Sequence, residues 1–222
     1  MEPTISPKSH HSRTYTLGEE IASSITHGIG AGLAIAALVI LIVRAVRHSD
    51  AQSVVAVSIY GASLILLYLM STLYHALTHP KAKKVFKVLD HSAIYLLIAG
   101  TYTVYTLSGL RGVMGWTVFG VIWGLAAAGI AMESFWVNRS KWISALVFIS
   151  MGWIVIFVAG PMKAALNSTS FHLLLWGGAA YTGGAIIYAM KKVPWTHPIW
   201  HLFVIAGSVL HFFSIWWLFD HH

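Results

Sequence analysis

Five polar residues of this 222-residue sequence lie in or beside strongly apolar runs, where they could do chemistry. Ser71 and His75 end one run, and Asp90 opens the next. The motif HPIWH, at the start of the last run, supplies His197 and His201. Residues four apart share a face of a helix, so Ser71 aligns with His75 and the two HPIWH histidines align with each other. The pattern predicts that three imidazoles and a carboxylate meet at one depth.

Three imidazole nitrogens with a carboxylate nearby suit a zinc site of the catalytic kind, which leaves a fourth position for water. We expect His75, His197 and His201 to be the zinc ligands. Asp90 would act as general base, orient the water or hydrogen-bond a ligand. Ser71 could hydrogen-bond the water, a ligand or a substrate carbonyl, or bond its own helix backbone. The sequence has no cysteine, so a metal must be held by histidines and carboxylates.

The composition identifies the elements that must position these residues. The chain is 57% hydrophobic and only 9% charged, which excludes an ordinary soluble domain. Its apolar runs are each near the roughly 20 residues that a helix needs to cross a membrane. We therefore predict an all-α polytopic membrane protein with seven transmembrane helices, at about 21–43, 54–77, 88–107, 113–132, 142–159, 171–190 and 198–219. Residues 1–20 would form a tail, and residues 21–222 a single transmembrane domain.

The basic residues predict the orientation, because cytoplasmic loops carry an excess of Lys and Arg. Most of the 14 Lys and Arg residues lie in the tail or after the second, fourth and sixth runs. The opposite side has only Arg44, Arg47, Arg111 and Lys163. We expect a cytoplasmic N-terminus, a C-terminus outside and membrane lipids as partners. The net charge of +7 fits basic loops at an anionic membrane surface, and no basic patch indicates a nucleic-acid partner.

Other polar residues have simpler interpretations, and any single histidine could also be a packing residue. His172 and His211, near the outer ends of their runs, are expected to be interfacial or to hydrogen-bond between helices. Glu133 ends the fourth run near two basic residues, where we expect an exposed ion pair. Glu20 and His27 are roughly aligned on the cytoplasmic half of the first run. His27 could be a partner of a metal ligand, a substrate contact or a packing residue, of which we expect the first or the last, and the role of Glu20 stays open.

Three segments carry a resemblance to a known family: GEEIASSITHGIG (18–30), STLYHALTHPKAKKVFKVLDHSAIYLLIAGTYT (71–103) and HPIWHLFVIAGSVLHF (197–212). They are similar to the bacterial hemolysin III family, the prokaryotic branch of the progestin and adipoQ receptor superfamily. The resemblance implies a seven-helix bundle in the bacterial plasma membrane, with zinc held near the cytoplasmic face by His75, His197 and His201. The sequence departs from the family at Ser23, where asparagine is expected, and this would change a contact near the site.

Two kinds of function stay open. The wider superfamily includes alkaline ceramidases, so the resemblance implies a zinc-dependent hydrolase of a lipid amide or ester in membrane lipid homeostasis. Asp90 would then assist proton transfer, and Ser71 would steady the water or the developing oxyanion. The alternative is a non-enzymatic, receptor-like or membrane-homeostasis protein with structural zinc. The family name hemolysin suggests that such a protein could form pores. The sequence does not indicate an oligomeric state.

Overall fold

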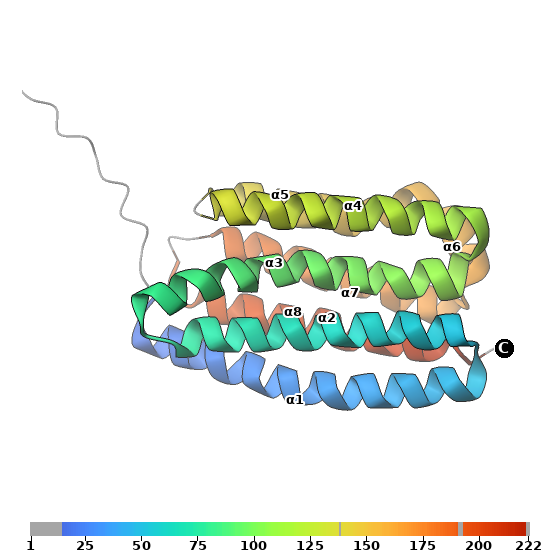
Figure 1. The fold of residues 1–222 in the computed structure, drawn as a ribbon, viewed down its shortest axis with the longest axis horizontal. Coiled ribbons are helices and arrows are strands. Elements are labelled where there is room, and N and C mark those ends of the chain that lie inside the picture. Colours follow the sequence, from blue (N-terminus) through green and yellow to red (C-terminus); the bar gives the residue numbers. More distant parts are fainter. Residues whose placement is uncertain (1–14, 138, 191–192, 221–222) are drawn as a thin grey trace, which may run out of the picture.

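A computed structural model describes residues 15–137, 139–190 and 193–220, which form helices and short connections without a strand. The helices lie side by side along one long axis, and the first begins at the opposite end of the bundle from the end of the last (Figure 1). In chain order they are α1 (Leu17–His48), α2 (Ala51–Ala76), α3 (Pro80–Val104), α4 (Gly112–Trp136), α5 (Lys141–Gly152), α6 (Ala159–Ala165), α7 (Ser168–Ala189) and α8 (Thr196–Leu218). A π-helical turn, η1 (Tyr105–Leu110), follows α3, and a 3-10 turn, η2 (Trp153–Val158), separates α5 from α6.

Several helices start where polar side chains cap their first turn. The Thr16 side chain accepts the backbone N–H of Glu19, and the Glu19 carboxylate accepts the backbone N–H of Thr16, which forms a capping box before α1. Asp50 caps α2 and Asn167 caps α7 in the same way, through the N–H groups three residues on. These caps start the helices before the apolar runs begin, so the α1 helix already includes residues assigned to the predicted tail.

Six helical segments are long and apolar enough to cross a membrane: Leu17–His48, Ala51–Ala76, Pro80–Leu110, Gly112–Trp136, Lys141–Ala165 and Thr196–Leu218. They coincide with six of the seven predicted spans. The remaining predicted span, 171–190, forms α7, which does not belong to this set of described segments. Its sequence is interrupted by Gly, Ser, Thr and Tyr residues, which lower its mean hydropathy. The structure therefore supports an all-helical membrane protein with six candidate spans.

Large apolar side chains cover the outside of the bundle. Val113, Phe135 and Phe157 are 86%, 92% and 87% exposed, and many Ile, Leu and Trp residues lie on the same outer surface. Soluble monomers rarely expose so much contiguous apolar surface, whereas a lipid bilayer favours it. The polar residues of interest lie on the inside, where Ser71, His75, Asp90 and His201 are buried.

The fifth span is broken inside the bundle, which the sequence did not predict. The α-helix stops at Gly152, and six residues of η2 follow before α6 begins. Tyr102 of α3 lies against the break, where its hydroxyl donates to the carbonyl oxygen of Gly152 and accepts the N–H of Val155, both at 2.7 Å. Backbone groups must be paired inside a membrane protein, so this one side chain replaces hydrogen bonds that a continuous helix would make.

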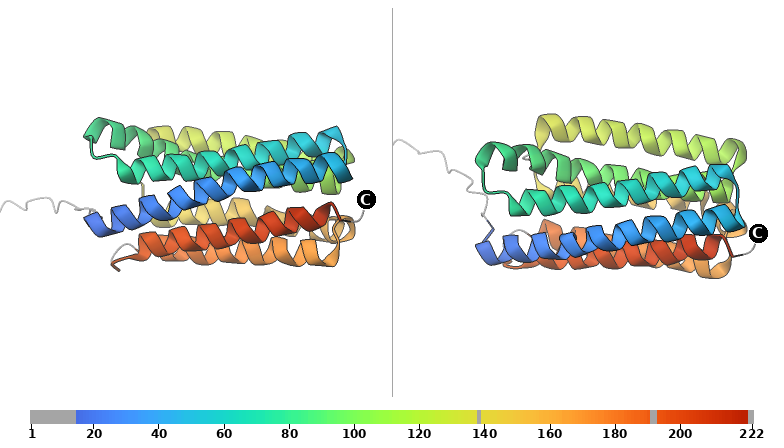
Figure 2. Two further views of the ribbon diagram at one scale, coloured as in Figure 1. Left: turned by 90° about the horizontal axis from the view of Figure 1, so that it is seen from below. Right: turned by 60° about the horizontal axis from the view of Figure 1, so that its bottom comes forward.

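Helix α1 joins the parts of the bundle that carry the chemistry. It packs against α2 on one side and against α8 on the other, while α7 packs along α8 (Figure 2). The end of α2 and the start of α8 therefore lie next to the start of α1. These three helix ends carry the predicted zinc ligands and, on α1, Glu20 and His27.

The expected exposed pairing of Glu133 is wrong, because Glu133 and Arg139 form a buried ion pair. Neither side chain is exposed, and their closest N and O atoms are 2.5 Å apart. Arg139 also donates to the Tyr95 hydroxyl at 3.0 Å, and His91 Nδ1 lies 3.4 Å from the Glu133 carboxylate. Helix α4 continues to Trp136, so Glu133 lies one turn before its end and turns inward toward α3.

Glu133→Ala is expected to lower the free energy of unfolding by about 3–5 kcal/mol, because it leaves the Arg139 guanidinium buried and unpaired. Thermal and denaturant unfolding in mild detergent would measure this loss. Ser134→Ala, at the exposed neighbouring position, is the control and should behave like the wild type. The double variant Glu133→Leu, Arg139→Met should recover most of the loss. Unchanged unfolding of Glu133→Ala would mean that the pair is not held as described.

Candidate metal centre

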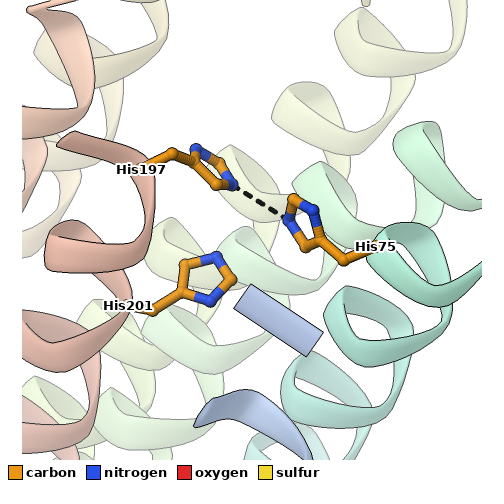
Figure 3. A group of neighbouring side chains, drawn as sticks. All are labelled: His75, His197 and His201. Carbon is orange, nitrogen blue, oxygen red and sulfur yellow. Dashed lines mark hydrogen bonds between the residues drawn. The ribbon is translucent and has the colours of Figure 1, made fainter. Parts of the chain in front are cut away.

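The structure brings His75, His197 and His201 together, as the sequence predicts. One nitrogen from each of the three rings lies within 4.8 Å of the others, and the Nε2 atoms of His75 and His197 are 2.9 Å apart. Figure 3 shows His197 and His201 projecting from α8 toward His75 on α2. All three side chains are buried.

Local helix structure explains how two chain segments more than a hundred residues apart supply one site. His75 lies in the last turn of α2, and His197 and His201 lie four residues apart at the start of α8, so they share its inner face. The first turn of α8 is tied to α1, since the N–H of Trp195 donates to Glu19 Oε1 at 2.7 Å. Trp195 has a φ of 64°, and helix α8 begins directly after it. This bond fixes the height of α8 against α1.

Each of the three rings has a hydrogen-bond partner at its Nδ1 atom. Glu20 Oε2 lies 2.6 Å from Nδ1 of His75, and the backbone oxygen of Ser23 lies 3.2 Å from Nδ1 of His201. The Tyr15 hydroxyl lies 3.0 Å from Nδ1 of the third ring, that of His197. All three partners belong to α1 or to the residues just before it. The α1 segment therefore orients every ring so that its Nε2 edge faces the shared space.

These contacts fix which ring nitrogens carry hydrogen. A carbonyl oxygen only accepts, so the Ser23 contact places the hydrogen of His201 on Nδ1 and leaves Nε2 as an acceptor. The Glu20 carboxylate does the same for His75. Nε2 of His201 is buried and has no hydrogen-bond partner among the described residues. The His75 lone pair faces Nε2 of His197 at 2.9 Å, whereas the buried lone pair of His201 is unpaired, which is costly unless a cation or a donor occupies the space.

A metal ion fits this donor set. Three imidazole nitrogens suit zinc, which they would bind at about 2.0–2.1 Å, so two ligand nitrogens in a tetrahedral site are about 3.3 Å apart. Since the three nitrogens already lie within 4.8 Å of one another, small ring movements would bring them to this spacing. The three histidines would hold the ion, and the remaining coordination position would be open to water. Serine in place of the asparagine expected at position 23 leaves this geometry intact, because Ser23 contacts His201 through its backbone oxygen.

Glu20→Gln is expected to weaken zinc binding about 10- to 100-fold, since carboxylates that orient a ligating histidine have effects of this size. The zinc dissociation constant, measured by competition with a chelator, is the readout. Lys83→Gln serves as a comparison, because Lys83 Nζ lies 2.7 Å from the other Glu20 oxygen but does not touch His75. Its effect should be smaller. Equal zinc affinity of Glu20→Gln and wild type would contradict the orienting role of the carboxylate.

Asp90 and Ser71 lie beside the three histidines. Asp90, on α3, is close enough to His75 and Ser71 to interact electrostatically with both, and Ser71 lies one turn before His75 on α2. Both residues are buried, and Asp90 Oδ2 and Ser71 Oγ have no hydrogen-bond partner among the described residues. Buried polar atoms are seldom left unpaired in proteins. These two atoms are therefore available to a water molecule or to a ligand.

His27 contacts the cluster without joining its converging nitrogens. Its ring stacks on that of His201, with ring centres 3.5 Å apart and an angle of 10° between the planes. Its two nitrogens have no partner among the described residues, and the side chain lines the adjoining cavity. His27 therefore packs against a predicted metal ligand and also borders the cavity.

Tyr15 is a part of the site that the sequence did not reveal, because it lies in a polar segment before the first apolar run. Lys141 Nζ donates to the Tyr15 hydroxyl at 2.5 Å, and the Tyr15 ring lies 4.5 Å from the His197 ring, centre to centre. Burial raises the pKa of Tyr15 above its ordinary value, so the phenol stays protonated. Tyr15 and Lys141 cover the histidines at the end of the bundle where α1 begins.

A large apolar cavity opens from the site into the bundle. Its volume is about 120 Å³. Asp90 and His27 line one end, and the walls come from α3, α5, η2, α7 and α8. Most of the lining is aliphatic or aromatic, including Leu97, Phe148 and Val155. The polar cluster therefore borders, through Asp90, an apolar space suited to a hydrocarbon chain.

The fold and the site define a helical membrane protein with a buried histidine triad. Residues 15–212 match the family described as haemolysin-III related, so the chain belongs to that family. It is 52% identical over 202 residues to Hemolysin-3 of Bacillus cereus, covering 91% of this chain and 92% of the relative. It is 46% identical over 201 residues to the Hemolysin-3 homolog of Bacillus subtilis (strain 168), covering 90% and 94%.

A more distant similarity extends beyond bacteria. The chain is 28% identical over 168 residues to the monocyte to macrophage differentiation factor of Homo sapiens, covering 71% of this chain and 68% of the relative. The family resemblance expected from the three sequence segments is thereby confirmed. The matched range includes Tyr15 and all five predicted site residues.

Proposed function

We propose that this protein is a zinc-dependent membrane hydrolase that cleaves an amide or ester bond of a lipid and acts in membrane lipid homeostasis. One observation carries the proposal. Three imidazoles, a buried carboxylate and a buried hydroxyl lie together, and the carboxylate, that of Asp90, lines an apolar cavity. His201 Nε2, Ser71 Oγ and Asp90 Oδ2 have no hydrogen-bond partner among the described residues. A lipid whose chain fills the cavity would place its polar head at these groups.

The hydrolysis would proceed by attack of water on the carbonyl carbon of the lipid. Zinc, when bound, lowers the pKa of water toward 7 and polarises the carbonyl group. Asp90 would accept a proton from the attacking water and deliver it to the leaving nitrogen or oxygen as the bond to the carbonyl carbon breaks. Ser71 would donate a hydrogen bond to the carbonyl oxygen as that atom gains negative charge. The products are a fatty acid and an amine or alcohol.

We further propose that the helices form seven crossings of the bacterial plasma membrane, with the N-terminus in the cytoplasm and the C-terminus outside. Helix α7 would be the additional crossing, since it is 22 residues long and packs along α8. The distribution of Lys and Arg supports the orientation. In this arrangement the histidine triad lies near the cytoplasmic side, together with Tyr15 and Lys141, which cover it.

The alternative is a non-enzymatic receptor-like or membrane-homeostasis protein in which zinc is structural. It is favoured by the position of the triad, because one ion would clamp α2 to α8. The Bacillus cereus relative is named Hemolysin-3, which adds pore formation to this alternative. A closed structural zinc site normally uses four protein ligands, and Asp90 could supply the fourth.

The experiment is a turnover assay of the zinc-loaded protein in nanodiscs with ceramides, other acyl amides and acyl esters. The proposal predicts release of fatty acid from at least one lipid, loss of this activity on chelation and its return with zinc. Zinc-loaded protein that releases no fatty acid from any of these lipids would instead support structural zinc. Leakage of dye from vesicles on addition of the protein, without any hydrolysis, would support pore formation.

A further inference from the structure

The far end of the apolar cavity contains a buried histidine that the proposed chemistry does not use. His211 lines the cavity and lies on α8, ten residues beyond His201. At a rise of 1.5 Å per residue, it lies roughly 15 Å along the helix from the histidine triad. The surrounding cavity wall is mainly apolar, with Leu174, Val204 and Met162 among its residues.

The His211 ring is held in one orientation by α7. Its Nε2 donates to the backbone oxygen of Leu174 at 3.2 Å, as expected for a histidine that bonds between helices. Gly177 lies against the same edge of the ring, since a Cβ atom at Gly177 would be 2.1 Å from Cδ2 and 2.4 Å from Nε2. The Tyr181 ring packs edge-on, with centres 5.3 Å apart.

The other nitrogen of His211 is an unused acceptor. The Leu174 oxygen only accepts, so the hydrogen of the neutral ring is on Nε2, and Nδ1 presents a lone pair. Nδ1 is buried and has no hydrogen-bond partner among the described residues, while His211 as a whole is only 6% exposed. An unpaired buried acceptor is unfavourable, so a donor that enters the cavity would be favoured here.

Three of the nearby tyrosine hydroxyls have other acceptors. Tyr105 donates to Ser214 at 2.8 Å, and Tyr68 donates to Ser208 at 2.9 Å. The Ser208 hydroxyl donates to a backbone oxygen at 2.9 Å, so Tyr181, 2.8 Å from Ser208, must also donate to it. These three hydroxyl hydrogens are therefore engaged, and the buried Tyr60 hydroxyl makes no hydrogen bond to Nδ1 or to any other described residue. The free acceptor at Nδ1 calls for a hydrogen that these tyrosines do not supply.

We propose that the cavity binds a lipid whose chain carries a hydroxyl group roughly 15 Å from its polar head, and that the hydroxyl donates to His211 Nδ1. The inference rests on the proposed function in that the head is placed at the histidine triad. It adds a requirement on the hydrocarbon chain of the lipid, since a chain without a hydroxyl group would leave His211 Nδ1 unpaired.

The test compares the binding of oleate and ricinoleate, which differ by one mid-chain hydroxyl, to the zinc-loaded full-length protein in nanodiscs. Binding can be followed by tryptophan fluorescence, because Trp153 and Trp200 line the cavity. Ricinoleate should bind about tenfold more tightly, which corresponds to one hydrogen bond of about 1.4 kcal/mol. An isomer with its hydroxyl next to the carboxyl group should bind like oleate. Equal affinities for oleate and ricinoleate in the wild type would overturn the inference.

Variants at His211 assign the preference to this ring. His211→Leu should bind both fatty acids with equal affinity, while His211→Gln, which keeps a donor and an acceptor, should retain part of the preference. His172→Leu, at an exposed position on α7, is the control and should discriminate like the wild type. A preference that survives in His211→Leu would overturn the inference.

The inference and the proposed function can fail separately. Asp90→Asn should keep the ricinoleate preference, because binding does not require hydrolysis. A preference for ricinoleate in a protein that hydrolyses no lipid would uphold the role of His211 and reject the hydrolase. Hydrolysis of a lipid without any preference for ricinoleate would support the hydrolase and reject the role of His211.

Discussion

Replacing His75, His197 or His201 singly with alanine is expected to remove stoichiometric zinc from the purified protein and to abolish lipid hydrolysis. Loss of a group that only orients a ligating histidine already weakens metal binding about 10- to 100-fold. Loss of a ligand should therefore exceed about 100-fold. The three variants should give similar losses, since each ring contributes one nitrogen to the same space. Zinc content by elemental analysis, on protein purified without a polyhistidine tag, is the measurement.

His79→Ala is the matched control for this prediction. His79 is exposed and follows His75 by four residues, but it lies after the end of α2. It should keep full zinc and full activity. Zinc content in His75→Ala equal to that of the wild type would show that His75 is not a ligand. An effect of His79→Ala as large as that of His75→Ala would show that the loss does not report on the buried triad.

Asp90→Asn is expected to lower the turnover of the lipid substrate by about 10²- to 10⁴-fold, the usual contribution of a general acid or base. The amide has nearly the shape of the carboxylate but cannot accept the proton of the attacking water. Zinc content should stay near that of the wild type, because the three histidines remain. Turnover and zinc content measured on the same preparation separate loss of chemistry from loss of metal.

Asp50→Asn is the control for Asp90→Asn, because it makes the same change at the opposite end of the bundle. Asp50 caps α2, and asparagine caps helices as well as aspartate does. Its turnover should match that of the wild type. Loss of zinc from Asp90→Asn together with loss of turnover would show that Asp90 is itself a ligand, and this outcome would favour the structural role of zinc.

The sequence predicted the helices well because long apolar runs leave few other structures open to them. Helix α2 (Ala51–Ala76) falls close to the predicted span of 54–77. The fifth span was predicted as one helix, and its break at Gly152 was missed. Nothing in that apolar run signals a break, because the group that compensates for it is the Tyr102 hydroxyl on another helix. Glu133 was placed at the surface for a similar reason, since its burial depends on packing against α3.

The histidine triad could be predicted from residue type, spacing and depth, whereas most of the groups that orient it could not. His75, His197 and His201 stand out because imidazoles are rare and costly inside a membrane. Tyr15 gives no such signal, since it lies in a polar segment and contacts His197 only through the fold. The contact of Ser23 is made by its backbone, which no residue type reveals.

X-ray absorption at the zinc edge of the purified wild-type protein tests the central claim most directly. A zinc site held by His75, His197 and His201 predicts one zinc per chain, with three imidazole nitrogens at about 2.0–2.1 Å and at least one oxygen. The signature should disappear in His197→Ala and persist in His79→Ala. Protein that binds no zinc, or zinc without imidazole neighbours, would contradict the account.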